Sequence, residues 1–172
     1  DAPSTTAALP PLFARWFESR GWQPHPHQLD LLASDRAAMS TLLIAPTGGG
    51  KTLAGFLPSL IDLEERPRPG LHTLYISPLK ALAIDIHRNL EAPIGEMALP
   101  IATETRTGDT PAAKRQRQRR KPPQILMTTP ESLALLLSFS DAEKMFASLQ
   151  RVIVDELHAL AGTKRGDLLS LG

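Results

Sequence analysis

The chain has 172 residues, 42% of them hydrophobic, which is enough for one well-buried core and too little for two. Its 19 Lys and Arg residues and 18 Asp and Glu residues give a net charge of +1, so overall charge provides no argument for nucleic-acid binding. The chain has no cysteine, which excludes disulfides and thiolate metal sites and agrees with a reducing, cytoplasmic location. It contains no apolar run of about eighteen residues and no secretory signal pattern, so we expect neither membrane insertion nor secretion.

The N-terminal part of the chain carries apolar residues at helical spacing. One apolar stripe lies within Leu12–Phe17 and a second within Leu29–Leu32. The prolines of "GWQPHPHQ" separate the two stripes, because proline disfavours a helical conformation in the residue before it. We therefore expect a helical lead-in over about residues 9–40.

Short apolar runs, each followed by polar turn residues, recur through the rest of the chain. The runs are "TLLIAPTGGG", "HTLYISPLK", "PIATETRTGDT", "QILMTTPES" and "RVIVDELH". Runs of this kind predict strands that are buried on both faces, as in a parallel sheet. Helices are predicted between them, over Lys51–Glu65, Leu79–Leu90, Pro111–Arg120 and Pro130–Phe146, the last with a break near "SFSD". This alternation predicts a doubly wound α/β fold over residues 41–172, with a mostly parallel sheet and helices on both faces.

Polar, glycine-rich or threonine-rich residues stand at the C-terminal end of each predicted strand. In open parallel sheets, ligands bind beyond the carboxyl ends of the strands. We therefore expect the five loops to form one composite site along a single edge of the sheet.

The stretch "LLIAPTGGGKTLAGFL" has the composition of a phosphate-binding loop between a strand and a helix. Gly48–Gly50 allow backbone N–H groups to converge on phosphate oxygens at the N-terminus of the following helix. Lys51 supplies a charge for the β- and γ-phosphates, and Thr52 a hydroxyl for Mg²⁺. Ala45 stands where the strict pattern has glycine, and the alternative is an ordinary glycine-rich turn before a helix. We interpret the stretch as a site for a nucleoside triphosphate.

The strand-end sequence "VIVDELH" offers the carboxylates that a triphosphate site needs. Asp155 is placed to hold Mg²⁺, and Glu156 to orient or deprotonate the attacking water. Alone, this pair is equally compatible with the solvated start of a helix, but a phosphate-binding loop about a hundred residues earlier favours the catalytic interpretation. Gln28 can pair with the N6/N7 edge of adenine, with an ordinary polar helix residue as the alternative.

Five motifs, "APTGGGKT", "SPLKAL", "TGDT", "TTPES" and "DELH", resemble in this order motifs I to II of superfamily 2 helicases. The segments "HALAGTKRG" and "GWQPHPHQ" resemble the large helicase-related (Lhr-like) family, particularly its bacterial DNA-ligase-associated branch. The resemblance extends over essentially the whole chain, residues 1–172. It implies the first of two RecA-like domains in a DExH-type helicase that uses ATP and Mg²⁺. It also implies 3′-to-5′ movement along single-stranded DNA, unwinding of DNA or RNA:DNA duplexes with a single-stranded tail, and a role in DNA repair.

The resemblance also assigns roles to individual residues. Glu156 would be the catalytic base, assisted by Lys51 and by Asp155, which with Thr52 would hold Mg²⁺. His158 would couple the state of ATP to the second domain. The nucleotide-binding residues would be Gln28, Thr47, Gly48, Gly49, Gly50, Lys51 and Thr52. The strand-contacting residues would be Ser77, Pro78, Leu79, Lys80, Thr107, Gly108, Asp109, Thr129, Pro130 and Glu131, although each of these segments alone is also typical of a helix cap.

The family's motif III and its second RecA-like domain, which carries the arginine fingers, are expected to lie outside this chain. Arginine fingers contribute roughly 10³- to 10⁵-fold to the rate in related phosphoryl-transfer systems. We therefore expect residues 1–172 alone to bind ATP weakly and to hydrolyse it slowly. The expected partners are that second domain and, by resemblance to the ligase-associated branch, a DNA ligase or a nuclease.

The basic run "KRQRQRRK" (Lys114–Lys121) lies on a predicted helix, and its charges go all the way round it. We interpret it as a solvated helix, with contact to nucleic acid or a partner as the alternative. Two other functions stay open for the chain. A small-molecule kinase would leave "SPLKAL" and "TTPES" unexplained, and a nucleotide-gated nucleic-acid clamp without catalysis would not need Glu156. Nothing in the residues themselves favours DNA over RNA, because contacts to phosphates suit both.

Overall fold

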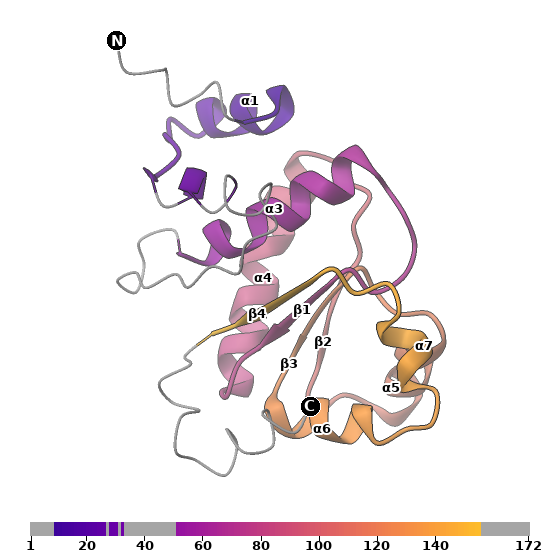
Figure 1. Cartoon of the computed structure of the whole chain (residues 1–172). Helices are drawn as coiled ribbons and strands as arrows, with labels where there is room; N and C mark the ends of the chain where they lie inside the picture. The colour runs from indigo at the N-terminus through magenta and orange to yellow at the C-terminus, as the bar shows by residue number, and fades with distance from the viewer. Residues whose placement is uncertain (1–8, 27, 31, 33–50, 156–172) are drawn as a thin grey trace. The chain divides into compact units, whose positions relative to one another are not determined.

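The structure of the chain, a computed structural model, describes residues 9–26, 28–30, 32 and 51–155 (Figure 1). It divides the chain into two compact units. The first unit consists of Asp1–Pro67 with Ala92–Pro100, and the second of Arg68–Glu91 with Ile101–Gly172. The expectation of one domain stays a prediction.

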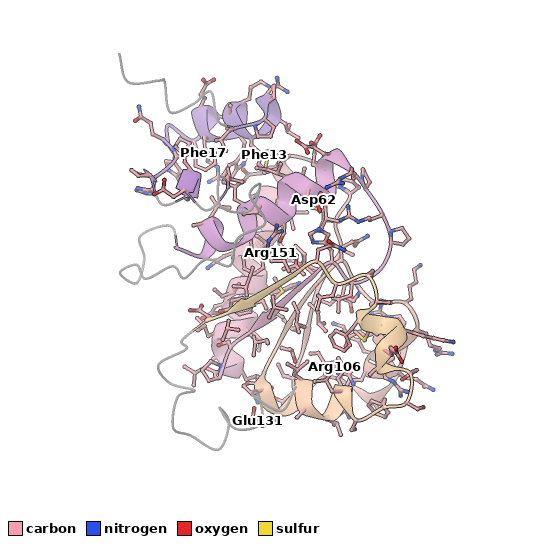
Figure 2. All side chains as sticks on the ribbon, in the orientation of Figure 1. Phe13, Phe17, Asp62, Arg106, Glu131 and Arg151 are labelled. Atoms are coloured by element: carbon pink, nitrogen blue, oxygen red, sulfur yellow. The ribbon has the colours of Figure 1, made fainter. Side chains whose placement is uncertain are left out.

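The first unit contains α1 (Pro11–Ser19) and α3 (Lys51–Glu65). Proline at the first turn of α1 suits the helix start, because the N–H that it lacks would have no helical partner there. Phe13 and Phe17, labelled in Figure 2, are buried along α1 and confirm the apolar stripe that was predicted there. The bounds of α3 are the ones predicted from the sequence.

A polar contact fastens α1 within the first unit. The indole Nε1 of Trp16 donates to the Glu96 carboxylate at 2.7 Å, and Arg20 forms an ion pair with the same carboxylate. These hydrogen bonds, first from Trp16 and then from Arg20, hold the pKa of Glu96 below its ordinary value. The contact joins α1 to the segment Ala92–Pro100 of its own unit.

The second unit is built on a parallel sheet of four described strands. They are β1 (Thr73–Ile76), β2 (Thr103–Arg106), β3 (Ile125–Thr128) and β4 (Arg151–Val154). Their order is β2-β3-β1-β4, and all neighbouring pairs are parallel, as predicted. The fifth predicted strand, within "TLLIAPTGGG", lies outside the described residues.

The prediction that every strand is buried on both faces is right for β1 and β3 and wrong for β2 and β4. The first two are central in the described sheet, whereas β2 and β4 are its outer strands and have neighbours on one side. On β4, Val152 and Val154 are 51% and 37% exposed.

Helices follow the strands of the second unit in the predicted order. They are α4 (Lys80–Glu96), of which the part up to Glu91 belongs to this unit, α5 (Ala112–Arg120), α6 (Pro130–Leu137) and α7 (Ala142–Phe146). Figure 1 shows α5, α6 and α7 on one side of the sheet and α4 on the other, which agrees with the predicted layers. The break between α6 and α7 falls at "SFSD", as predicted. No helix in the described part of the chain is long and apolar enough to cross a membrane.

One predicted helix end is wrong. The helix predicted to stop at Leu90 continues as α4 through Pro93 to Glu96. A proline inside a helix removes one backbone hydrogen bond. Ile94 and Met97 are nevertheless buried, and this burial offsets the loss.

The register of the sheet separates its two faces. Leu74 of β1 stands beside Leu126 of β3, and Ile76 lies two residues further along β1 on the same face. These side chains form one buried cluster with Leu133 and Leu136 of α6, together with Leu71 and Met145. The cluster fixes α6 against the sheet and so positions the loop that precedes it.

Candidate functional site

The carboxyl ends of the four strands meet at one edge of the sheet, as the parallel pattern predicted. Backbone hydrogen bonds continue past the strands there. The N–H of Ser77 donates to the carbonyl of Thr128 at 3.0 Å, and the N–H of Asp155 donates to the carbonyl of Ile76 at 2.9 Å. The loops after β1, β3 and β4 therefore start from fixed neighbouring positions.

The loops after β1, β2 and β3 border one open pocket of about 360 Å³, here named the rim pocket. Six of the residues predicted to contact a strand line it: Pro78, Lys80, Thr107, Gly108, Thr129 and Glu131. They come from the loops after β1, β2 and β3, so residues far apart in the sequence meet at one place. The remaining members of the predicted set are Ser77, Leu79, Asp109 and Pro130, which lie in the same three loops without lining the pocket.

Local hydrogen bonds shape the loops after β2 and β3. The hydroxyl of Thr129 accepts from the backbone N–H of Ser132 at 3.4 Å and caps α6, which has Pro130 in its first turn. The hydroxyl of Thr107 accepts from the N–H of Asp109 at 3.3 Å, in a tight turn before α5. The predicted cap at "TTPES" is confirmed, and a cap at this position leaves Thr129 on the pocket wall.

The rim pocket carries charges of both signs. Lys80, at the start of α4, forms an ion pair with Asp109 of the neighbouring loop. Glu131, in the first turn of α6 and labelled in Figure 2, adds an exposed carboxylate to the lining. The pocket is therefore not a simple patch of positive charge.

Three lining residues come from helices and were not predicted as site residues: Arg115 of α5 and Ser132 and Leu135 of α6. Ser132 and Leu135 follow "TTPE" on the helix that this motif begins. Their short distance from the motif in sequence was the signal that could have identified them as site residues. Arg115 lies inside the basic run, where nothing in the sequence separates it from its five basic neighbours.

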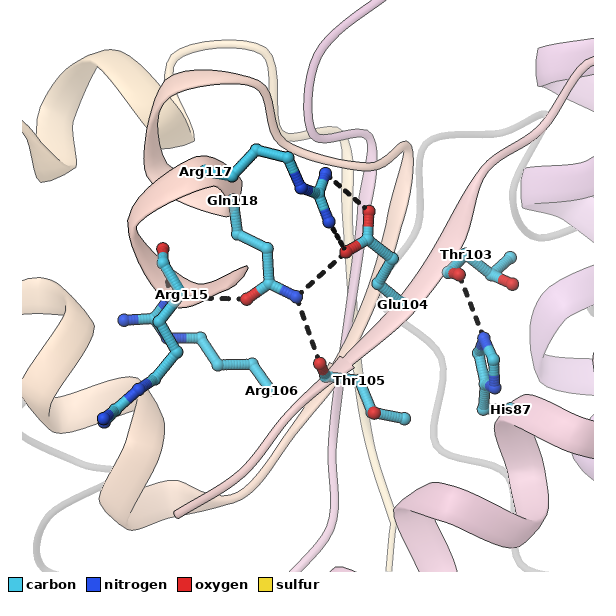
Figure 3. A network of polar contacts seen from close by, with 8 residues as sticks. All are labelled: His87, Thr103, Glu104, Thr105, Arg106, Arg115, Arg117 and Gln118. Atoms are coloured by element: carbon cyan, nitrogen blue, oxygen red, sulfur yellow. Dashed lines mark hydrogen bonds and ion pairs between the residues drawn. The ribbon is translucent and has the colours of Figure 1, made fainter. Parts of the chain in front are cut away.

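The helix that carries the basic run is only partly solvated. Arg117 forms an ion pair with Glu104 of β2, and Gln118 is buried and donates to Glu104 and to the carbonyl of Thr105 (Figure 3). Arg119 pairs with Asp141 at 2.8 Å. The interpretation as a helix solvated all round is wrong for this inner face, which packs on polar groups of the sheet.

Asp155 stands directly after β4 at the same edge of the sheet. One of its carboxylate oxygens, Oδ2, accepts a hydrogen bond from the hydroxyl of Tyr75 at 2.5 Å. Tyr75 is only 2% exposed, and it faces the side of the sheet opposite to Leu74. Sequence reasoning missed Tyr75, although it is the chain's one tyrosine and lies two residues before Ser77.

Gln28 lies in the first unit and is 2% exposed. Its side-chain oxygen Oε1 accepts from the backbone N–H of His25 at 2.8 Å. This bond gives the amide a defined orientation, which a residue that recognises one face of a base requires.

Several predicted site residues lie outside the described residues: Thr47, Gly48, Gly49, Gly50, Glu156 and His158. Lys51 and Thr52 are the first two residues of α3, and because residues 33–50 lie outside the described residues, the predicted helix start behind the glycines stays a prediction. Among the described residues, no group of three or more His, Cys, Asp or Glu side chains is gathered as a metal site.

The chain matches the DEAD/DEAH box helicase family over residues 25–171. It is 44% identical to a Mycolicibacterium smegmatis protein named "Lhr helicase/ probable uracil glycosylase", over 93% of this chain and 11% of that protein. It is 40% identical to the Escherichia coli "Lhr helicase/uracil glycosylase", over 99% of this chain and 12% of that protein. The chain therefore spans about a tenth of the length of these two relatives.

The fold is similar to that of solved helicase structures. The structure of Mycobacterium smegmatis helicase Lhr bound to ssDNA and AMP-PNP matches with a TM-score of 0.89 and 41% identity, over 98% of this chain and 23% of that chain. A hypothetical ATP-dependent RNA helicase from Sulfolobus tokodaii matches with a TM-score of 0.75 over 95% of this chain and 46% of that chain, and at 19% identity it supports the fold alone. These matches confirm the predicted RecA-like α/β fold.

Proposed function

Because the chain belongs to the DEAD/DEAH box helicase family, we propose that it is the N-terminal RecA-like, ATP-binding part of an Lhr-type helicase. The observation that carries the proposal is the rim pocket, where the loops after β1, β2 and β3 meet at the edge of the sheet that also holds Asp155. A small-molecule kinase needs no such convergence of three loops beside its triphosphate site.

The nucleotide in this proposal is ATP, held by the residues of the phosphate-binding loop. Gly48–Gly50 donate backbone hydrogen bonds, Lys51 balances phosphate charge, and Gln28 recognises adenine. The surroundings of Gln28 support this role, because its side-chain amide is buried and is held in one orientation by the backbone N–H of His25. The M. smegmatis structure contains AMP-PNP, an ATP analogue, which agrees with this assignment.

The Asp155 carboxylate suits Mg²⁺, which prefers oxygen ligands. Its Oδ2 is bound by Tyr75, and Mg²⁺ held by Asp155 and the Thr52 hydroxyl would neutralise phosphate charge. Glu156, the next residue, would accept the proton of the attacking water. His158 would relay the state of the nucleotide to a second RecA-like domain of the whole protein.

The nucleic-acid strand in this proposal crosses the rim pocket. Its lining includes two threonines, residues at the starts of two helices, and charged side chains, and groups of these kinds contact a sugar-phosphate backbone without reading bases. The M. smegmatis structure contains single-stranded DNA, and we propose the same track here. We also propose 3′-to-5′ movement, unwinding of DNA or RNA:DNA duplexes, a role in DNA repair in the cytoplasm, and a ligase or nuclease as partner.

The test is ATP turnover by the full-length protein, with and without single-stranded DNA or RNA, in the wild type and in Glu156→Gln. We expect strand-stimulated turnover that the substitution lowers by at least a hundredfold while ATP still binds, because the general base is lost. Strand binding without turnover in the wild type would instead indicate a nucleotide-gated clamp. Turnover indifferent to any strand would contradict the proposal and favour the kinase.

A further inference from the structure

β2 and α5 carry five arginines: Arg106, Arg115, Arg117, Arg119 and Arg120. Two of them have carboxylate partners, since Arg117 pairs with Glu104 and Arg119 with Asp141. Neither Arg106 nor Arg115 has a carboxylate partner in the part of the chain that the structure describes. The charges of Arg106 and Arg115 are therefore not matched by a carboxylate among the described residues.

Arg106 is the deeper of the two and is only 2% exposed. Its Nη1 donates to the backbone carbonyl of Arg115 at 2.9 Å and approaches Oε1 of Gln118 at 3.4 Å (Figure 3). Both acceptors are neutral. Burial, and then the nearby charges of Arg115 and Arg119, lower the pKa of Arg106. The guanidinium nevertheless keeps its charge, because arginine is not deprotonated in proteins.

Arg115 brings this unbalanced charge to the wall of the rim pocket. Its Nε is buried, and among the described residues no acceptor lies within hydrogen-bonding reach of it. A buried donor without an acceptor is unfavourable, so the described position of this side chain is not held by a bond at Nε, and the guanidinium gains by turning toward an acceptor in the pocket. The other cation of the pocket, Lys80, already pairs with Asp109.

The chemistry of the missing acceptor follows from the guanidinium. Its planar set of donors matches the two non-bridging oxygens of a phosphate group. Glu131 on the same wall disfavours a ligand that carries several negative charges in a small volume. A phosphodiester, with one negative charge, agrees better with this arrangement than a free phosphate.

We infer that Arg115 binds one phosphodiester group of the nucleic-acid strand in the rim pocket, with Arg106 beneath it as a fixed source of positive charge. This inference rests on the proposed function, since it names the residue that holds the strand at that site. The contact depends on no base, so it acts equally on every sequence. It also adds one released counterion to strand binding.

The first experiment compares Arg115→Gln with Arg120→Gln in the full-length protein. Arg120 is exposed on the same helix and does not line the pocket, so the two variants lose the same charge from the same element. Glutamine is a good helix former, and the backbone carbonyl that Arg106 uses remains in both variants. Thermal unfolding of both variants checks that the fold is kept.

Binding is measured by the fluorescence anisotropy of a labelled oligothymidylate over a series of salt concentrations. We expect Arg115→Gln to weaken binding about tenfold and to lower the slope of log affinity against log salt by about 0.7. Arg120→Gln should change both values little. Equal behaviour of the two variants would overturn the inference.

A second measurement identifies the phosphate itself. Oligothymidylates are made with a single neutral methylphosphonate at successive positions. In the wild type and in Arg120→Gln, one position should weaken binding, and in Arg115→Gln that same position should have no effect. If every position costs the same in Arg115→Gln as in the wild type, the inference is wrong while the proposed function stands. If the wild type binds no oligonucleotide, the proposed function itself fails.

Discussion

The hydrogen bond from Tyr75 to Asp155 leads to a prediction for Tyr75→Phe. Phenylalanine keeps the ring, which is 2% exposed and packed, and removes only the hydroxyl that donates to Oδ2 at 2.5 Å. A hydrogen bond to a charged group contributes about 1.5–3 kcal/mol. Asp155 is only half-buried, so we take the lower end and expect a loss of about 1.5 kcal/mol in the free energy of unfolding.

The substitution also has a consequence for metal binding. Without the hydroxyl, the carboxylate of Asp155 loses the hydrogen bond by which Tyr75 orients its Oδ2. Partners that orient a metal ligand in this way contribute roughly 10- to 100-fold to metal affinity. In the proposed function, the Mg²⁺ concentration for half-maximal ATP turnover should therefore rise by about tenfold.

The assays are urea unfolding of residues 1–172 and a Mg²⁺ titration of turnover in the full-length protein. Ser148→Ala is the control, because it also removes a single hydroxyl, which donates to the carbonyl of Leu71 at 2.8 Å before the start of β4, whereas Asp155 follows the end of that strand. It should leave the Mg²⁺ dependence unchanged. A Tyr75→Phe variant with the stability and Mg²⁺ dependence of the wild type would refute the reasoning.

Two further predictions concern charges on the α5 side of the sheet. Burial raises the pKa of Glu104, but hydrogen bonds from Arg117 and Gln118 outweigh it, so the pKa lies below its ordinary value of 4.5. The free energy of unfolding that Glu104→Gln loses relative to the wild type should therefore be largest above about pH 4.5 and should shrink as the pH falls below that value. Urea unfolding at a series of pH values measures this difference, and a difference that persists in acid would contradict the prediction. Glu131→Gln should tighten oligothymidylate binding about twofold at low salt, because it removes a repelling charge; weaker binding in the same anisotropy assay would mean that the carboxylate accepts a hydrogen bond from the strand.

The sequence predicted the elements around the site well, because the signals were local. The apolar runs of β1 and β3 and the Thr-Pro start of α6 each depend on a few neighbouring residues. The edge of the sheet was equally predictable, since parallel strands place their carboxyl ends together. The end of α4 was not, because continuation through Pro93 depends on burial of residues beyond it.

The inner face of α5 shows why other parts were not predictable. Arg115, Gln118 and Arg119 are spaced as one helix face and are the residues of α5 that are shielded from solvent. An apolar face at this spacing would have been recognised by its hydrophobic period. Here Gln118 and Arg119 bind polar partners instead, namely a carboxylate and a carbonyl of the sheet and the carboxylate of Asp141. The sequence therefore shows only a uniformly polar helix. When polar side chains are buried against polar groups, the sequence shows no hydrophobic period that would reveal the buried face.

Tyr75 was missed for a related reason. β1 is buried on both faces, so its side chains show no alternation between apolar and polar positions. Which of them faces Asp155 is decided by the pairing of β1 with β4, where Tyr75 stands beside Ile153. That pairing joins segments about 80 residues apart and is not encoded in either segment alone.

The hydrogen bonds at the edge of the sheet restrict how nucleotide and strand could influence each other. The backbone N–H of Asp155 donates to the carbonyl of Ile76. Ser77, which follows Ile76, donates its own N–H to the carbonyl of Thr128, and Thr128 directly precedes the pocket residue Thr129. The metal-binding side and the strand-binding side of the proposed site therefore share one hydrogen-bonded edge, which cannot separate without breaking the sheet. A change in strand affinity on ATP hydrolysis requires an element with two arrangements. In this fold that element is not the edge of the sheet, so in the proposed function the coupling acts through the loops or through the proposed second domain, which is the role proposed for His158.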